Sequence, residues 1–429
     1  MAVGFGLRLE KVVNPLAEPG DDALAYRALA ESLYTDGTYG SPDFTYRSDW
    51  SPGAPLIYAG SYFLTGGVRD GVARGAEALL GTAAILVVFL LTARISPTRD
   101  GPDSQVAALL AAGMVALYPP FIHSTGALMS EPPAIFTLPA AVLAFLWADS
   151  RDSARAWVVP GLLLGLTALI RPEYLAVAAL FGVLLVFRVG IARGVRSTVV
   201  AALLFGAAVL VPIVPWTIHN YVSLGRVVPI STGSGKALYV GTSLPDDGDY
   251  QRVKASLLER YTGRRLPPDS AALDRVDPVP LFDRAARLYP ELSRDAALGR
   301  IGRENLGEYL GSDPLGYLAM TVRKVGRMWG SGVGEAMSGP AGSAIQKLLV
   351  VLGIAGLALL AWRRRWEAIA IAIPIVTVTA VGAITLAPAR RNEILMTLVL
   401  PLAAVALTEA VGWIARRRGI QTGRDSVTS

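Results

Sequence analysis

The chain has 429 residues, of which 52% are hydrophobic and only 17% are charged, and its mean hydropathy is +0.45. This balance excludes an ordinary soluble protein, whose surface needs more charge. The net charge of +6 does not indicate nucleic-acid binding, because the basic residues cluster just beyond apolar runs and no aromatic-basic recognition module accompanies them. The chain has no cysteine and only two histidines, which excludes disulfides and thiolate sites and leaves little material for a zinc site.

The first segment, residues 1–13, is apolar but too short to cross a bilayer, which takes about 20 residues. It also lacks the charged start and the small-residue cleavage site of a signal peptide. We interpret it as the tail of a first membrane helix, and whether the chosen start site shortens that helix stays open.

Nine apolar runs of roughly spanning length come next, and they must be helices because lipid offers no hydrogen-bond partners to the backbone. They lie near 72–93, 105–122, 131–149, 156–170, 173–190, 197–218, 346–362, 366–388 and 392–414. The apolar stretch 55–66 is about half a crossing long, and its aromatic residues suit the bilayer surface. We therefore expect a helix that lies at the interface there.

The basic loops fix the orientation of these helices, because loops rich in arginine stay in the cytoplasm. One alternating arrangement satisfies all of them; it places inside Arg94 and Arg99, Arg151 and Arg155, residues 188–196, residues 363–365 and the tail. The segments 14–71 and 219–345 then face outward. The sequence thus predicts a multi-pass protein of the plasma (inner) membrane.

Three parts follow from this pattern. Residues 1–218 form a membrane domain that includes a first extracytoplasmic loop, 14–71. Residues 219–345 form an extracytoplasmic loop domain, in which 314–329 is an amphipathic helix along the membrane surface. Residues 346–429 supply the last membrane helices and a cytoplasmic tail. The predicted fold class is all-α, with about nine or ten membrane helices.

Ionisable residues gather on the predicted outer face, at the ends of many different helices. Charges near a bilayer are costly, so their convergence favours a functional site. The candidates include Asp22, Glu131, Arg171, His219, Lys236, Arg390 and Arg391. Each has a plainer interpretation too: Asp22 or Asp21 can cap a helix, Glu131 can stabilise the start of its own helix, and Arg171 can pair with Glu173.

The order of short motifs resembles that of GT-C fold glycosyltransferases of the protein O-mannosyltransferase and aminoarabinose transferase type (family 39). Asp22 and Tyr26 have the spacing of the family's Asp-x-x-x-Tyr element in the first outer loop. Further matching pieces run along nearly the whole chain: Ser51-Pro-Gly-Ala-Pro-Leu56, Met129-Ser-Glu-Pro132, Gly161 to Gly165 with Arg171-Pro172, Pro215-Trp-Thr-Ile-His-Asn-Tyr221, Asp313-Pro-Leu-Gly-Tyr317 and Ala389-Arg-Arg391. The chain departs from the pattern at His219, where arginine is common.

The resemblance implies an integral-membrane hexosyl- or pentosyltransferase of the cell envelope. Its donor would be a polyprenyl-phosphate-linked sugar, and its acceptor an unidentified protein, glycan or lipid. Asp22 and Glu131 would be catalytic, with Asp22 as the base of an inverting transfer. The donor phosphate would meet Arg390, Arg391, Lys236, Arg171, Tyr26 and His219. No cofactor is indicated with certainty, although Asp22 and Glu131 could share a divalent cation. The alternative is a transporter or flippase of a lipid-linked or anionic solute.

Overall fold

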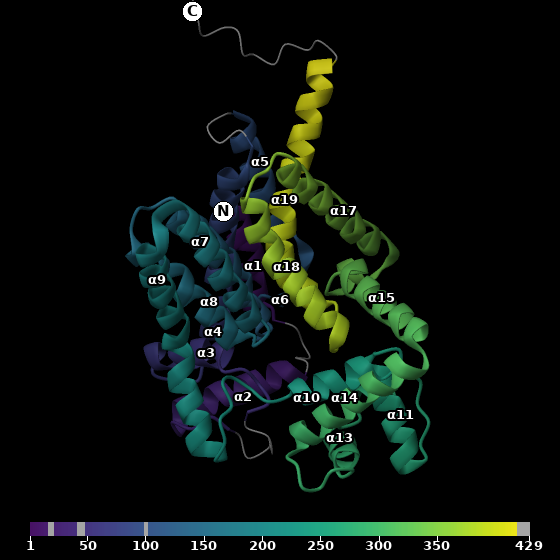
Figure 1. The fold of residues 1–429 in the computed structure, drawn as a ribbon. Coiled ribbons are helices and arrows are strands. Elements are labelled where there is room, and N and C mark those ends of the chain that lie inside the picture. The colour runs from purple at the N-terminus through teal and green to yellow at the C-terminus, as the bar shows by residue number, and fades with distance from the viewer. Residues whose placement is uncertain (16–20, 41–47, 98–101, 418–429) are drawn as a thin grey trace, which may run out of the picture.

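The computed structural model describes residues 1–15, 21–40, 48–97 and 102–417, and its described regular elements are all helices (Figure 1). Six are long and apolar enough to cross a membrane: α4 (Asp70–Ile95), α7 (Glu131–Asp149), α9 (Tyr174–Leu224), α17 (Pro340–Trp362), α18 (Glu367–Ile384) and α19 (Arg390–Arg417). Two shorter apolar helices accompany them, α5 (Pro102–Leu117) and α8 (Val158–Ile170), the latter preceded by a 3-10 turn η1 (Ala154–Trp157). The prediction of an all-α multi-pass bundle is confirmed.

Three of the predicted runs are joined, bent or ended at a glycine or at prolines. The runs 173–190 and 197–218 join into the single helix α9, which is broken at Gly194, where φ is +77°. Such a φ is accessible to glycine but strained for other residues. The run 105–122 is not one helix, because α5 stops at Leu117 and a short helix α6 (Pro119–Ser124) begins with two prolines. Proline supplies no backbone N–H and clashes with the preceding turn, so it starts helices better than it continues them.

Helix α19 forms the centre of the bundle. Every residue from 392 to 405 is buried against neighbouring helices, chiefly α17, α5 and α7. Its approach to α17 depends on Gly356, where an added Cβ would lie 2.0 Å from the backbone oxygen of Leu402. Small residues allow such close contact between membrane helices.

The amino-terminal helix α1 (Ala2–Val13) packs on α4 and α5 in the same bundle. Arg8 is buried there and donates hydrogen bonds to the backbone oxygens of Val115 and Ala116. These carbonyl groups belong to the last turn of α5, where backbone oxygens have no hydrogen-bond donor within their own helix. Arg8 therefore ties α1 to the end of α5.

Most helices of the polar segments lie at one end of the bundle, the lower end in Figure 1. The segment between α1 and α4 contributes α2 (Asp21–Thr35) and the expected short helix α3 (Gly53–Thr65). The segment between α9 and α17 contributes α10 (Ser234–Thr242), α11 (Tyr250–Thr262), α12 (Ala271–Asp274), α13 (Val279–Ala286), α14 (Arg294–Ser312), α15 (Pro314–Gly330) and α16 (Glu335–Ser338). Helices α10 to α14 share a small core of their own, which includes Leu257, Phe282 and Leu298. The expected helix 314–329 corresponds to α15.

The arginine-rich loops contact one another at the opposite end. Arg94 pairs with Glu367 at 3.1 Å, and Arg365 donates a hydrogen bond to the backbone oxygen of Ser96. Arg188 lies over the ring of Trp366 and binds Asp149 at 2.8 Å. Loops that the charge pattern assigned to one side of the membrane therefore lie at one end of the bundle.

Candidate active site

The candidate site forms where several helices begin or end at the polar end of the bundle. Asp22 is in the first turn of α2, Glu131 is the first residue of α7, and Arg171 directly follows α8. Arg390 and Arg391 open α19. Each helix end thus contributes one or two charged side chains, which is why residues far apart in the sequence meet here.

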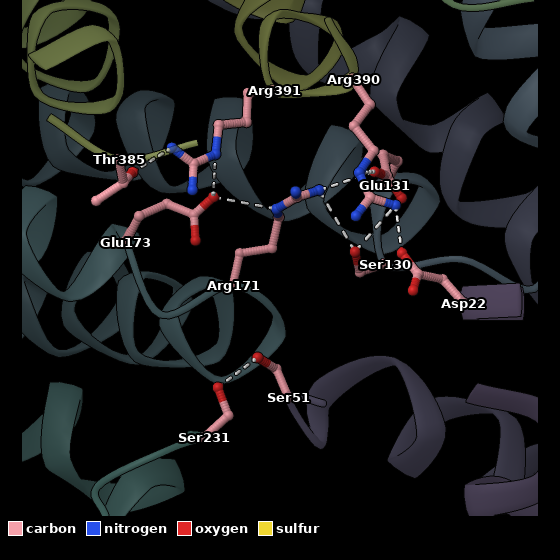
Figure 2. A network of polar contacts seen from close by, with 10 residues as sticks. All are labelled: Asp22, Ser51, Ser130, Glu131, Arg171, Glu173, Ser231, Thr385, Arg390 and Arg391. Atoms are coloured by element: carbon pink, nitrogen blue, oxygen red, sulfur yellow. Dashed lines mark hydrogen bonds and ion pairs between the residues drawn. The ribbon is translucent and has the colours of Figure 1, made fainter. Parts of the chain in front are cut away.

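These five side chains and that of Glu173, the residue before α9, form a line of alternating charge (Figure 2). Their order is Asp22, Arg390, Glu131, Arg171, Glu173 and Arg391, and consecutive members approach within 2.5, 3.9, 2.9, 3.2 and 4.0 Å. Arg391 ends the line with a hydrogen bond of 3.1 Å to the hydroxyl of Thr385. Three carboxylates and three guanidinium groups neutralise one another, and this pairing offsets the cost of removing the charges from water.

Asp22 is the half-buried end of this line. It accepts a hydrogen bond from Arg390 at 2.5 Å and another from the side chain of Trp50. Burial disfavours the charged carboxylate, but Arg390 and, further away, Lys236 outweigh burial and hold the pKa of Asp22 below its ordinary value. Asp22 is therefore a carboxylate at neutral pH. Asp21 begins α2, but its side chain lies outside the part that the structure describes.

Glu131 and Arg171 form the most buried part of the line. Their side chains are 3% and 11% exposed, and Ser130 lies within 3.4 Å of both. Burial opposes the charge on Arg171, yet Glu131 and Glu173 outweigh it and raise the pKa of Arg171 above its ordinary value. The pKa of Glu173 is lowered because Arg171 and Arg391 overcome the effect of its burial. The interpretation of Arg171 as a partner of Glu173 is thus correct, and Arg171 binds Glu131 as well.

Two cavities adjoin the Asp22–Arg390 pair. The smaller one has a volume of about 440 Å³ and contains Tyr26, Arg171 and Arg391 in its wall. The larger one has a volume of about 750 Å³ and runs past Glu131 to α6. Asp22, Arg390 and Lys236 line both, so any molecules bound in the two cavities would meet at Asp22.

Lys236 supplies a positive charge at this junction. It is half-buried in α10, and no carboxylate of the described residues lies within ion-pair distance of its amino group. Burial lowers its pKa from the ordinary lysine value, with Asp49 and Asp22 acting in the opposite direction. Lys236 is therefore better placed than the paired arginines to receive a new anion.

The stretch Gly233-Ser-Gly-Lys236 is not a phosphate loop. The carboxylate of Asp295 accepts hydrogen bonds from the backbone N–H groups of Gly233, Gly235 and Lys236, at 2.9, 2.8 and 3.4 Å. These are the donors that a phosphate would need at the start of a helix. These backbone donors are therefore already occupied by a side chain of this protein.

Two further candidates have different surroundings. Tyr26 is buried, hydrogen bonded to Ser130, and burial raises its pKa to about 12. It lines the smaller cavity, as the proposed contact with the donor requires. His219 instead stacks on Trp216 at 4.6 Å between ring centroids and lines neither cavity. The structure therefore does not bring His219 into the charged line.

Sequence reasoning gave too little weight to two buried carboxyl groups. Glu77 lies in α4 and accepts hydrogen bonds from Tyr58 and from the backbone of Gly126 and Met129, so it holds the loop that leads to Glu131. Its position within an apolar run could have identified it from the sequence, because acidic residues are rare in membrane helices and usually have a partner or a function there. Glu393, in the first turn of α19, lines the larger cavity.

No group of three or more histidine or acidic side chains among the described residues has the arrangement of a metal site. Asp22 and Glu131, which the sequence suggested could share a divalent cation, each bind an arginine. The positive charge next to these carboxylates comes from guanidinium groups of this chain.

Comparison with known proteins gives a family model that matches less than half of the chain. Residues 49–219 match the family model of dolichyl-phosphate-mannose-protein mannosyltransferase. A sequence comparison with curated proteins gives no match.

Solved structures supply the fold. The apo oligosaccharyltransferase of Archaeoglobus fulgidus aligns with 98% of this chain and 51% of its own length, at 16% identity and a TM-score of 0.57. The same enzyme tethered to an acceptor peptide with the NVT sequon gives a TM-score of 0.53 at 15% identity, over 98% of this chain and 50% of that one. The chain has a GT-C fold. Its resemblance to GT-C glycosyltransferases, read from the motifs, is confirmed by the family match and by this fold.

A third solved structure is less similar in shape. ArnT from Cupriavidus metallidurans bound to undecaprenyl phosphate aligns with 97% of this chain and 79% of its own length, at 15% identity and a TM-score of 0.41. The chain spans about half the length of the oligosaccharyltransferases it matches.

Proposed function

We propose that this protein is a glycosyltransferase that moves a sugar from a polyprenyl-phosphate carrier to an acceptor hydroxyl. The observation that carries the proposal is the position of Asp22, an ionised carboxylate between two cavities and bound to Arg390. The family match and the GT-C fold support it, because that fold is shared with an oligosaccharyltransferase.

Asp22 is the base of the proposed reaction. The acceptor oxygen attacks the anomeric carbon of the sugar, the bond from that carbon to the phosphate oxygen breaks, and the acceptor proton passes to Asp22. Attack opposite the leaving phosphate inverts the anomeric centre. Because Asp22 is ionised, it accepts a hydrogen bond from the acceptor before transfer begins. Glu131 acts by holding Arg390 and Arg171 in place.

The smaller cavity is the proposed site of the donor phosphate. Four basic side chains and three acidic ones line it: Lys236, Arg171, Arg390 and Arg391 against Asp22, Asp49 and Glu173. Since each arginine already has a carboxylate partner, Lys236 provides the additional charge that a phosphate needs, and the arginines add hydrogen bonds. The Tyr26 hydroxyl is a further donor to the phosphate. Fixed cations stabilise the departing phosphate without reorganisation, which is how electrostatic catalysis lowers a barrier.

The site is proposed to face away from the cytoplasm, in the plasma membrane. The grouping of the basic loops at the opposite end supports this orientation. Cysteines at Ser312, an exposed residue at the end of α14, and in the tail at Ser426, which lies outside the described residues, should react with a membrane-impermeant maleimide from opposite sides. Reaction of both from the same side would contradict the orientation. Ser243 lies in the same segment as Ser312, but it is buried, so a cysteine there would not react readily with the maleimide.

A transporter or flippase is the competing function, but the charges favour a transferase. The alternating line lies where helices begin or end at the polar end of the bundle, whereas a transport path needs polar groups near the middle of the membrane. The purified chain in nanodiscs, supplied with polyprenyl-phosphate-linked sugars extracted from its host and with cell-envelope acceptors, should release free polyprenyl phosphate. If no carrier is released while the same lipids change leaflet in vesicles that contain the protein, the transferase proposal is wrong.

Metal dependence is tested in the same assay. Since guanidinium groups neutralise Asp22 and Glu131, we propose that a divalent cation is not shared by these two carboxylates. Release of polyprenyl phosphate should then continue in the presence of EDTA. Loss of turnover that is restored by added Mg²⁺ or Mn²⁺ would contradict this.

A further inference from the structure

Glu393 differs from the other buried carboxyl groups near the site. It lies three residues after Arg390 in α19, it is 1% exposed, and it lines the larger cavity. Its Oε1 atom has no hydrogen-bond partner among the described residues. Buried polar atoms are nearly always hydrogen bonded, so an atom of this kind at a cavity wall indicates that a ligand completes it.

The other carboxyl groups near the site all have hydrogen-bond or ion-pair partners in this protein. Asp22 and Glu131 each bind an arginine, and Glu77 accepts hydrogen bonds from a tyrosine and from backbone N–H groups. Glu393 has no cationic side chain within ion-pair distance in the described part of the chain. Its hydroxyl neighbour is Ser124, which lines the same cavity.

The lining of the larger cavity fits a polar but uncharged ligand. Four basic and four acidic side chains balance there: Arg27, Arg74, Lys236 and Arg390 against Asp22, Asp70, Glu131 and Glu393. Apolar side chains such as Leu24, Leu128 and Leu386 cover the rest of the wall. A volume of about 750 Å³ lies within the usual size of small-molecule sites, which combine apolar walls with a few placed polar groups. A sugar ring has the matching surface, because its C–H groups are apolar and its hydroxyl groups donate hydrogen bonds.

We propose that Glu393 is a recognition residue for a sugar ring bound in the larger cavity, where its unpartnered carboxyl oxygen accepts hydrogen bonds from ring hydroxyl groups. This deepens the proposed function and rests on it. The ring belongs either to the donor or to a glycan acceptor. The smaller cavity is the more basic of the two, so the lipid phosphate itself is expected there and not beside Glu393.

Chemical labelling tests this without a turnover assay. Dicyclohexylcarbodiimide modifies carboxyl groups in apolar surroundings, and peptide mass spectrometry locates the product. In the full chain in nanodiscs, methyl glycosides of mannose, glucose and galactose are tried as protecting ligands. At least one should slow the labelling of Glu393 severalfold, while undecaprenyl phosphate should not. Glu77 is the internal control, because it is equally buried but lines neither cavity.

Variants add a second measurement. Glu393→Gln should weaken binding of the protecting glycoside about tenfold, which corresponds to about 1.4 kcal/mol, and leave binding of undecaprenyl phosphate within about twofold. Ser124→Ala, a smaller change in the same wall, should weaken the glycoside in the same direction if Glu393→Gln does not fold. Protection by undecaprenyl-phosphate-linked mannose that excludes the free glycoside would assign the ring to the donor; simultaneous binding would assign it to the acceptor.

The proposal is overturned if no glycoside changes the labelling of Glu393, if undecaprenyl phosphate alone protects it, or if Glu393→Gln and Ser124→Ala both bind glycosides as the unchanged protein does. Failure of the proposed function gives a different result. In that case undecaprenyl phosphate does not bind, or Arg390→Gln does not affect its binding. This result does not depend on whether glycosides slow the labelling of Glu393.

Discussion

The two ends of the bundle both contain buried carboxylates paired with arginine, but only one end has the properties of a site. At the basic-loop end, Glu367 is 1% exposed and is bound by Arg94 and Arg365, each at 3.1 Å. None of the cavities described above reaches this cluster. At the other end, Glu131 is also buried, but the line of ion pairs continues from it to Asp22. Both cavities adjoin Asp22.

The difference shows that a buried ion pair alone is weak evidence for function. Removing charges from water costs about as much as their attraction returns, so such pairs serve to fasten elements together as often as to catalyse. The pairs at the basic-loop end join the loops after α4 and α17. Every member of the line at the Asp22 end contributes to a cavity wall, and Asp22 and Arg390 line both cavities. Substitutions matched between the two ends can therefore separate fastening from chemistry.

The largest effect is expected for Asp22→Asn. The amide keeps the size of the side chain but cannot accept a proton, so turnover should fall by about 10²-fold or more. Release of polyprenyl phosphate by the purified protein, at matched expression and donor occupancy, measures it. Asp36→Asn is the control, because Asp36 is exposed after the same helix and lines neither cavity.

Two outcomes would shift the assignment of the base. Normal turnover in Asp22→Asn together with inactivity in Asp21→Asn would move the base by one residue. Activity in both variants would remove α2 from the chemistry, and Glu131 would become the leading candidate.

The second effect concerns the arginines. Arg390→Gln or Arg391→Gln should raise the apparent donor KM, or lower turnover, by about tenfold or more, because a hydrogen bond to a charged group contributes about 1.5–3 kcal/mol. Arg94→Gln at the basic-loop end removes a similar pair and should leave the donor KM unchanged. Equal kinetics in the double Gln variant and the unchanged protein would reassign Arg390 and Arg391 to contacts with lipid headgroups.

Much of this arrangement could be predicted from the sequence, since the signals are local. Apolar runs predict membrane helices, and arginine-rich loops predict their grouping at one end. The alternation of the membrane helices also placed Asp22, Glu131, Arg171 and Arg390 on one face. The partners of these residues could not be predicted, because which carboxylate meets which arginine depends on how helix ends pack.

His219 and Glu393 show the limits of the sequence argument. His219 occupies the right face and a family position, yet the last turns of α9 direct it toward Trp216. Glu393 lies one turn into an apolar helix, where the sequence alone does not say whether it faces lipid, another helix or a cavity. Only the packing of α19 at the centre of the bundle settles that.

A third, smaller effect is on stability. Glu367→Gln should lower the free energy of unfolding by about 1–3 kcal/mol, because Arg94 and Arg365 lose their charged partner, while donor KM stays the same. Glu131→Gln should lower both stability and turnover, since Glu131 also orients Arg171 and Arg390. Melting temperatures and donor kinetics of the two variants, measured side by side, provide the test. A change of donor KM in Glu367→Gln would show that the two ends are coupled.

The smallest effect is that of pH on the unchanged protein. The pKa of Asp22 is depressed in the folded chain, because Arg390 outweighs the burial of the carboxylate. Asp22 is thus already ionised from about pH 5 to about pH 8, and turnover limited by its ionisation should be flat over that range. Turnover should decline only as the pH falls through the depressed pKa, and the stability that the Asp22–Arg390 pair contributes is lost over the same acidic window. Arg390→Gln removes the lowering influence, so its acid limb should move to higher pH, whereas Arg94→Gln should leave the limb in place. A pH–rate profile of the three proteins measures this, and a limb near neutral pH in the unchanged protein would assign the base to a group other than Asp22.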